Sequence, residues 1–170
     1  MTEQALTGAT DAERPEGFRR VAGLLAALGH PHAPLWLAVS ARTCAEAADA
    51  LQVQVGQIAK SVVFRRRSDE AAVLVVASGD RRVDEKKVAA RVGPIGRADA
   101  EFVKARTGYS IGGVSPVGHT TPPVLLIDRD LFRFEEVWAA AGHPNGVFKL
   151  APQALVALTG APVADVVVVV

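Results

Sequence analysis

The chain has 170 residues, of which 49% are hydrophobic and 22% are charged. This balance predicts one soluble globular domain with a well-buried core and excludes a wholly disordered chain. The formal net charge of +1 gives no overall affinity for polyanions. The charge is uneven, because residues 60–106 carry twelve Lys or Arg against seven Asp or Glu. A basic middle is compatible with a nucleic-acid partner, although a solvated face of mixed charge is the commoner explanation.

The single cysteine, Cys44, excludes an internal disulfide and a cysteine-rich metal site. It stands at a helix start, and we expect it to be a small buried residue. The histidines show no metal-ligand spacing, so we expect neither a metal nor a cofactor. No apolar run is long enough to cross a bilayer and no secretory signal is visible, so we expect a cytoplasmic protein without a membrane partner.

The first 15 residues are polar and aperiodic, so we expect a loosely attached tail followed by one domain over residues 16–170. Apolar residues from Phe18 to Leu28 recur at helical spacing, and Gly29 ends this predicted helix. A short strand is expected over residues 35–39.

Thr43 and Glu46 have the spacing of a capping box, which predicts an alanine-rich helix through Leu51. Two β-branched runs at residues 61–64 and 73–76 flank a charged turn and predict a hairpin.

Asp84 and Asp99 are predicted N-caps of two helices, the first running through Arg91 and the second ending at Gly108. Further elements are expected as a strand at 124–127, a helix at 134–141 ended by Gly142, a strand at 146–150, a helix from Pro152 to near Gly160, and a terminal strand at 166–170. The fold class expected from this order is α/β, a single domain with a mixed, largely antiparallel sheet wrapped by helices.

Residues 107–119 contain four glycines and a proline, a composition that excludes a helix or a long regular strand. A loop of this kind can direct several backbone N–H groups at one point, where a phosphate or a developing oxyanion would bind. An ordinary wide turn is an equally good interpretation of this loop by itself.

Two side chains are candidates for chemistry. Lys60 is expected at the mouth of a strand, between the apolar end of a helix at Ile58-Ala59 and residues 61–64, where it could hold a phosphate or a carbonyl. The competing interpretation is a surface lysine with a buried stem. His143 follows the expected helix stop and could donate a hydrogen bond or move a proton, although a lone histidine is more often structural.

Several established catalytic motifs are missing from the sequence. There is no Gly-x-Ser-x-Gly elbow, no phosphate loop ending in Gly-Lys-Ser/Thr, and no strand–Gly-x-Gly-x-x-Gly–helix fingerprint. An enzyme with this sequence would therefore activate water or use a group of its own substrate.

Five segments appear in one order and at roughly one spacing that together resemble the YbaK family, the prolyl-tRNA-synthetase-associated editing domains. They are residues 43–51, 57–64, 75–80, 112–118 and 141–146. The resemblance covers about residues 38–164. It implies a compact α/β domain with a mixed sheet, and an aminoacyl-tRNA deacylase that removes a wrongly attached amino acid, often from tRNA for proline.

The resemblance also implies which residues act. Lys60 corresponds to the family's functional lysine, Gly112–Pro116 to its Gly-x-x-x-Pro substrate loop, and His143 to a position where some members have histidine and others glycine. We expect catalysis to involve Lys60, Gly112, Gly113, Ser115 and His143. We expect substrate binding to involve Lys60, Ser61, Tyr109, Gly112, Val114, Pro116, Gly142 and Asn145.

The expected mechanism is hydrolysis of the aminoacyl ester, with loop N–H groups stabilising the oxyanion and assistance from the substrate's ribose hydroxyl. The expected partners are the acceptor end of aminoacyl-tRNA and an aminoacyl-tRNA synthetase, with the chain acting as a monomer or a homodimer. Two alternatives stay open: a non-catalytic module that binds tRNA and docks on a synthetase, and a Schiff-base enzyme that uses Lys60 with pyridoxal phosphate.

Overall fold

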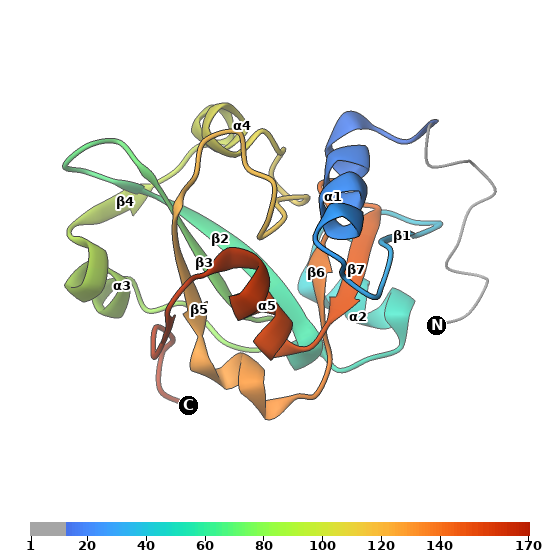
Figure 1. The fold of residues 1–170 in the computed structure, drawn as a ribbon. Coiled ribbons are helices and arrows are strands. Elements are labelled where there is room, and N and C mark those ends of the chain that lie inside the picture. The colour runs from blue at the N-terminus through green and yellow to red at the C-terminus, as the bar shows by residue number, and fades with distance from the viewer. Residues whose placement is uncertain (1–12) are drawn as a thin grey trace.

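A computed structural model of the protein describes residues 13–170, and Figure 1 shows them as a sheet with helices packed around it. Most of the expected N-terminal tail, residues 1–12, lies outside the described residues. Arg14 is inside them and is 91% buried, with its guanidinium 4.6 Å from the centre of the Trp36 ring. The last residues of the expected tail are therefore attached to the domain.

One mixed sheet forms the centre of the protein, with the strand order β1-β7-β6-β2-β3-β5-β8 and with β4 beside β2. The strands are β1 (Leu35–Trp36), β2 (Ile58–Arg66), β3 (Ala72–Ser78), β4 (Ile95–Arg97), β5 (Val124–Asp128), β6 (Val137–Ala140), β7 (Gly146–Leu150) and β8 (Val163–Ala164). Pairs β1/β7, β2/β3, β2/β4 and β6/β7 are antiparallel, and pairs β2/β6, β3/β5 and β5/β8 are parallel. The predicted fold class is confirmed.

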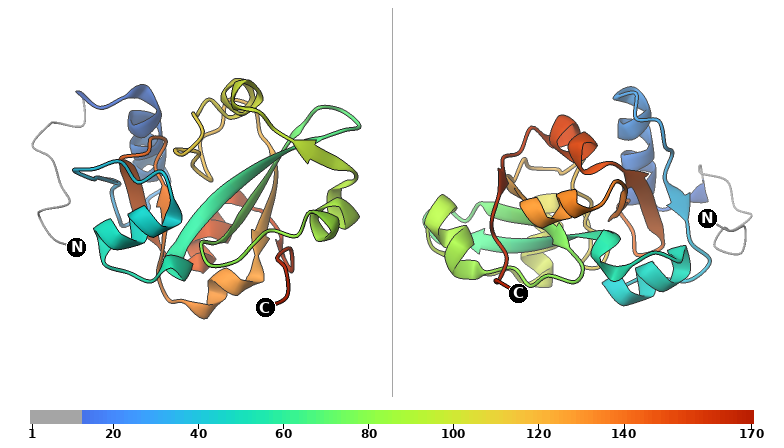
Figure 2. Two further views of the ribbon diagram at one scale, coloured as in Figure 1. Left: turned by 180° about the vertical axis from the view of Figure 1, so that it is seen from behind. Right: turned by 90° about the horizontal axis from the view of Figure 1, so that it is seen from below.

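Helices cover both faces of this sheet (Figure 2). They are α1 (Glu16–Ala27), α2 (Cys44–Leu51), α3 (Glu85–Val92), α4 (Ala100–Thr107) and α5 (Pro152–Thr159), with 3-10 turns η3 (Val55–Gln57) and η4 (Arg129–Arg133). Side chains along β2 alternate between the faces. Ala59 and Val63 join the core cluster of α1, α4 and α5, whereas Ile58 packs with α2 and Phe64 with α3.

The helix starts follow the sequence signals that predicted them. The Thr43 hydroxyl accepts a hydrogen bond from the Glu46 N–H, and the Glu46 carboxylate accepts one from the Thr43 N–H, which completes the capping box of α2. The Asp84 and Asp99 carboxylates accept hydrogen bonds from N–H groups in the first turns of α3 and α4, without the return bond of a capping box. The predicted hairpin is β2 and β3, longer at both ends than predicted.

The helix predicted over residues 134–141 is wrong. This segment contains β6, which lies between β2 and β7 and pairs with both. Val137, Trp138 and Ala139 are buried because β6 is an inner strand with both faces covered. An inner strand has continuous apolar residues, and a short run of that kind cannot be told from a buried helix by its periodicity.

The terminal strand predicted over residues 166–170 is also wrong. The strand that adds to β5 is β8, and beyond it only Val167 forms an isolated bridge, to Val83. Val168, Val169 and Val170 are exposed. Two smaller differences are that β1 ends at Trp36 and that β4 was not predicted.

Candidate active site

A cavity of about 300 Å³ opens where strands β2 and β6 separate. The two strands pair only at Ile58–Trp138 and Ala59–Ala139, and beyond that point β2 continues beside β3 without β6. The cavity is lined by the start of α2, by β2 and β6, by the glycine-rich loop and by the β6–β7 turn. Of the predicted site residues, it brings together Lys60, Ser61, Gly112, Val114 and His143.

Lys60 lies inside β2 and not at the mouth of a strand. Strand β2 begins at Ile58, and the expected helix end before it is the single 3-10 turn η3. The Lys60 ammonium donates a hydrogen bond to the carbonyl oxygen of Arg81, in the loop after β3. The Arg81 carbonyl holds the end of the Lys60 side chain in place without neutralising its positive charge.

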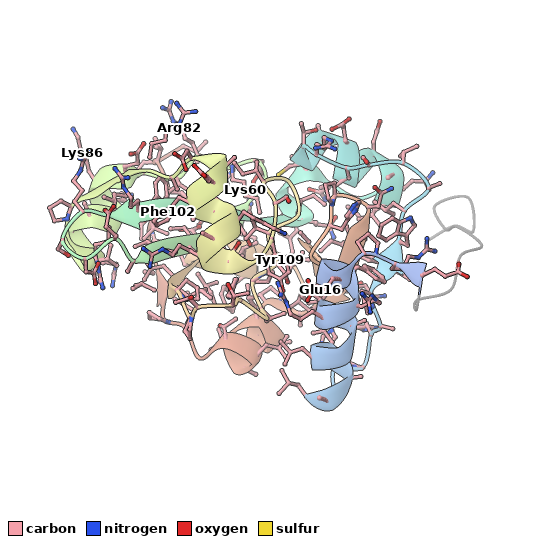
Figure 3. All side chains as sticks on the ribbon, turned by 90° about the horizontal axis from the view of Figure 1, so that it is seen from above. Glu16, Lys60, Arg82, Lys86, Phe102 and Tyr109 are labelled. Atoms are coloured by element: carbon pink, nitrogen blue, oxygen red, sulfur yellow. The ribbon has the colours of Figure 1, made fainter. Side chains whose placement is uncertain are left out.

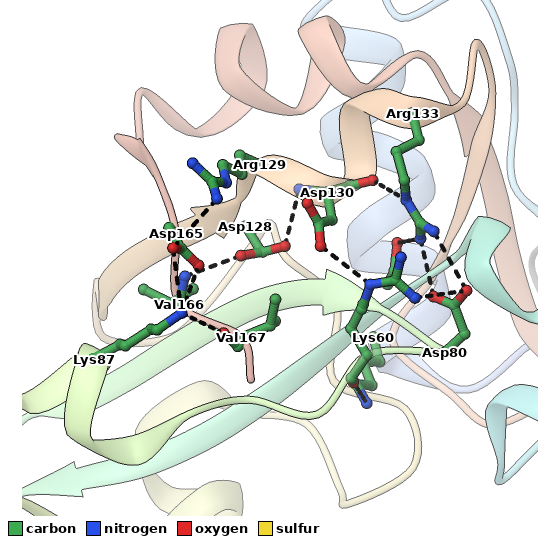
Figure 4. Close-up of polar contacts among 12 residues, drawn as sticks. Lys60, Asp80, Lys87, Asp128, Arg129, Asp130, Arg133, Asp165, Val166 and Val167 are labelled. Atoms are coloured by element: carbon green, nitrogen blue, oxygen red, sulfur yellow. Dashed lines mark hydrogen bonds and ion pairs between the residues drawn. The ribbon is translucent and has the colours of Figure 1, made fainter. Parts of the chain in front are cut away.

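The Asp80 and Asp130 carboxylates, drawn with Lys60 in Figure 4, are paired with arginines. The Asp80 carboxylate pairs with Arg81 at 3.3 Å and with Arg133 at 2.9 Å, and Asp130 pairs with Arg81 at 3.1 Å. Within residues 13–170, no carboxylate lies within ion-pair distance of Lys60. The positive charge of Lys60 is therefore available to an anionic group of a ligand.

The glycine-rich loop contributes Gly112 and Val114 to the cavity wall. The Gly113 N–H closes a turn by donating to the Ser110 carbonyl at 3.0 Å, so it is not available to a ligand. The N–H groups of Gly112 and Val114, which both line the cavity, donate to no acceptor within residues 13–170. A Cβ at Gly113 would lie 2.7 Å from the His143 Cα, so the loop packs closely against the β6–β7 turn.

His143 lies in the turn between β6 and β7 and not after a helix. Its Nδ1 accepts a hydrogen bond from the Asn145 N–H at 3.0 Å, so in the neutral ring the proton is on Nε2. The ring stacks on Trp36 with centres 4.7 Å apart. Burial, and then the positive charge of Arg42, lower the pKa of His143 below its ordinary value of 6.5. The side chain is therefore a neutral hydrogen-bond donor at pH 7.

Four predicted residues of the loop do not line the cavity, and Gly113 is one of them. Tyr109, Ser115 and Pro116 are buried in the core, and Figure 3 shows Tyr109 beside α1 while Lys60 lies apart from it. The Tyr109 hydroxyl donates to the carbonyls of Val117 at 2.7 Å and Gly118 at 3.1 Å. Tyr109 therefore holds the loop closed from inside, and burial raises the pKa of its hydroxyl.

Replacing Tyr109 with phenylalanine is expected to lower the free energy of unfolding by about 1–3 kcal/mol, because the buried Val117 carbonyl loses its donor. Chemical denaturation measures this loss. A ligand-binding tyrosine would give the opposite pattern, in which unfolding is unchanged and ligand affinity falls.

Gly142 and Asn145 shape the β6–β7 turn without lining the cavity. Gly142 has a φ of +83°, and a Cβ there would collide with the backbone oxygen of Gly17. The Asn145 amide donates to the Leu37 carbonyl at 2.9 Å and accepts from the Ser40 hydroxyl at 2.9 Å. Both residues attach the turn to the N-terminal part of the chain.

Ser61 and Cys44 line the cavity in different ways. Residues 60 and 61 point to opposite faces of the sheet, and the Ser61 hydroxyl is buried without a hydrogen-bond partner in residues 13–170. Cys44 is half-buried, and burial raises the pKa of its thiol, an effect that Lys60 partly opposes. A protonated thiol is a poor nucleophile.

Arg42, which was not predicted, lines the cavity from the loop before α2. It is exposed, and within residues 13–170 no carboxylate forms an ion pair with it. The Ala41 N–H donates to the Pro144 carbonyl at 2.8 Å, which brings Arg42 beside the β6–β7 turn. Its position just before a capping box was the available signal, because a helix start combined with a cation is suited to an anion. With Lys60 it makes the cavity cationic, because no Asp or Glu of the described chain lines it.

Residues 13–170 contain no group of three or more metal-ligating side chains. Among the same residues there is no helix that is both long and apolar enough to span a membrane.

Comparison with known proteins shows the family to which this chain belongs. The profile of the aminoacyl-tRNA editing domain matches residues 38–158, well over half of the chain. The chain belongs to the aminoacyl-tRNA editing domain family. The predicted resemblance to YbaK-like editing domains is thereby confirmed.

Relatives of this editing domain occur both as separate proteins and inside a larger enzyme. "Uncharacterized protein YwhH" of Bacillus subtilis is 37% identical over 117 residues, which are 68% of this chain and 74% of the relative. A proline–tRNA ligase of Chromobacterium violaceum is 33% identical over 64% of this chain and 18% of the ligase. A crystal structure described as "a putative trans-editing enzyme for prolyl tRNA synthetase" has a TM-score of 0.85 and 43% identity, covering 92% of this chain and 100% of that chain.

Proposed function

We propose that this protein is a trans-editing aminoacyl-tRNA deacylase that hydrolyses the ester of a mischarged tRNA, with tRNA for proline or a related tRNA as substrate. The observation that carries the proposal is that Lys60, Gly112 and Val114 line one cavity. Membership of the editing family and the likeness to a structure described as a prolyl trans-editing enzyme support it. A prolyl-tRNA synthetase is the proposed protein partner.

In the proposed reaction, water adds to the acyl carbon and the bond from this carbon to the ribose oxygen breaks. The amino acid leaves as a free acid, and the ribose oxygen takes up a proton to become a hydroxyl. The carbonyl oxygen becomes negative as water attacks, and the N–H groups of Gly112 and Val114 would stabilise it. Lys60 and Arg42 would hold the phosphate of the terminal nucleotide or the reacting end of the substrate.

No strong base of the described chain lines the cavity. His143 has its acceptor nitrogen occupied by the Asn145 N–H, and the Cys44 thiol has a raised pKa. The neighbouring ribose hydroxyl of the substrate is therefore the proposed participant in water activation. His143 would donate from Nε2 to the water or to the carbonyl.

The cavity volume of about 300 Å³ is at the lower end for ligand sites and suits a small aminoacyl group. The test is a panel of tRNAs mischarged with alanine, serine, threonine and cysteine, read for release of the free amino acid. We expect enzyme-dependent release from at least one of them. A one-methylene difference would change the rate by about 10–200-fold. Tight binding without any release would support the non-catalytic binding module instead.

The contribution of His143 is expected to depend on pH in a defined direction. Its lowered pKa leaves more than half of the rings neutral at pH 6.5, so the ratio of wild-type to His143→Ala rate constants should change little between pH 8 and 7. Below pH 6.5 the unfolded chain takes up the proton first, so stability from this group is lost as pH falls through the folded pKa. Protonation of Nδ1 also replaces the acceptor of the Asn145 N–H with a donor.

Single-turnover rate constants of both proteins between pH 5 and 8 measure this ratio. We expect it to fall below pH 6.5. A ratio that increases on acidification would show that the charged imidazolium is the active form.

A further inference from the structure

The turn that carries His143 packs against a part of the chain that precedes the matched editing domain. The match begins at residue 38, whereas α1 and β1 occupy residues 16–36. Gly17 at the start of α1 lies against Gly142, so closely that a Cβ on either glycine would collide with the other's carbonyl oxygen. A Cβ at Gly146 would lie 2.6 Å from the Phe18 ring. Both ends of the turn therefore rest on the N-terminal segment.

Trp36 is the side chain of this segment that contacts His143 directly. The two rings are stacked, with an interplanar angle of 29° and centres 4.7 Å apart. Trp36 is itself held by Phe18, whose ring meets it edge-on at 5.4 Å, and by the guanidinium of Arg14 at 4.6 Å from the ring centre. Strand β1 pairs Trp36 with Gly146 of β7, which places the indole over the turn.

Two contacts together determine the direction of the His143 Nε2–H. The hydrogen bond from the Asn145 N–H to Nδ1 fixes one edge of the ring, and the stack on Trp36 fixes its plane. Without the stack, the imidazole could rotate about the Nδ1 hydrogen bond and direct its donor away from the cavity. A misplacement of about 1 Å in a reacting group can lower a rate by as much as 10²-fold.

We propose that Trp36 is a positioning residue for His143 and that residues 14–36 are a functional part of the editing site. The proposal rests on the proposed deacylase function, in which His143 acts as a hydrogen-bond donor. Trp36 does not line the cavity, so a ligand held there would not contact it. It acts by holding the imidazole in the plane from which Nε2–H reaches the ligand.

The kinetic test is a double-mutant cycle of Trp36→Leu and His143→Ala in single-turnover deacylation of a mischarged tRNA. We expect Trp36→Leu to slow the wild-type protein on the order of 10-fold and to leave the His143→Ala protein unchanged. The enzyme concentration at half-maximal rate should stay the same, because Trp36 makes no substrate contact. Trp36→Phe keeps a stacking ring and should restore most of the rate.

The second test needs no activity. In a proton NMR spectrum of a chain with four histidines, the ring protons of His143 are assigned by their absence in His143→Gln. We expect them to be shifted upfield by the indole ring current in the wild-type protein and to return to ordinary positions in Trp36→Leu. Leu35→Ala is the matched control, since it removes apolar volume from the same strand on the Leu37 side, away from His143. In Leu35→Ala, the His143 ring protons should keep their upfield shift.

Each outcome decides one question. Equal slowing by Trp36→Leu with and without His143, or no slowing in the wild-type protein, would overturn the positioning role while leaving deacylation intact. Absence of any deacylation would overturn the proposed function, and the NMR spectra would then decide the placement of His143 alone. Unshifted His143 protons in the folded wild-type protein would overturn the stack itself.

Discussion

Replacement of Lys60 by alanine is expected to slow single-turnover deacylation on the order of 10²-fold or more. Lys60 lines the cavity, and its ammonium is held by a carbonyl while the nearby carboxylates Asp80 and Asp130 are paired with arginines. The mutation therefore removes a charge that a substrate anion would otherwise meet. It leaves the arginine–carboxylate pairs of Figure 4 in place.

Lys86→Ala is the matched control for this loss of charge. Lys86 is an exposed lysine of α3 that does not line the cavity, and it should keep the wild-type rate (Figure 3). Thermal unfolding of both variants shows whether the fold is intact. An unchanged rate for a folded Lys60→Ala protein would remove Lys60 from the mechanism.

Gly113→Ala is expected to lower both the rate and the stability. A Cβ at this position would lie 2.7–2.8 Å from backbone atoms of His143, so the loop or the turn must move. Overpacking of this kind costs about 1–3 kcal/mol of folding free energy. Displacement of the Gly112 and Val114 N–H groups from the acyl oxygen should slow deacylation by up to about 10²-fold.

Gly23→Ala gives the comparison for a glycine without such a neighbour. Gly23 is inside α1, and a Cβ there would have no atom within 4 Å. Alanine at this helical position should raise stability by about 0.5–1 kcal/mol and leave the rate unchanged. Denaturation curves measure the stability of both glycine variants, and single-turnover experiments measure their deacylation rates. Equal behaviour of the two glycine variants would contradict the close packing of loop against turn.

The elements predicted correctly are those whose signals are local. The capping box of Thr43 and Glu46, the Asp84 cap and the Asp99 cap each act within one helical turn, so the sequence alone contains the cause. Strand β6 is different, because its conformation depends on pairing with β2 about 80 residues earlier and with β7. No window of the sequence contains both partners.

The candidate site was predictable in part, because some of its residues lie in local sequence motifs. Lys60, Gly112, Val114 and His143 were predicted from motifs, and the fold brings them to one cavity. Tyr109 was predicted from its place in the loop, but its hydroxyl turns inward to two loop carbonyls.

Residues outside the motifs became visible only in the fold. Arg42 reaches the cavity because residues 37–41 hydrogen-bond to the distant β6–β7 turn. Trp36 contacts His143 from more than a hundred residues away in sequence, through the pairing of β1 with β7. The capping box after Arg42 marks a helix start suited to an anion, but no local signal identifies the distant turn that either residue contacts.

A crystal structure with a non-hydrolysable analogue, an alanyl group joined by an amide to the 3′ carbon of adenosine 5′-phosphate, tests the central claim most directly. The amide oxygen is predicted to lie about 3 Å from the N–H groups of Gly112 and Val114, with the Lys60 ammonium beside the same ligand. Lys60 also borders an open groove with Arg82 and Glu85, so the position of the amide oxygen decides. An analogue bound in that groove, with the cavity empty, would contradict the claim.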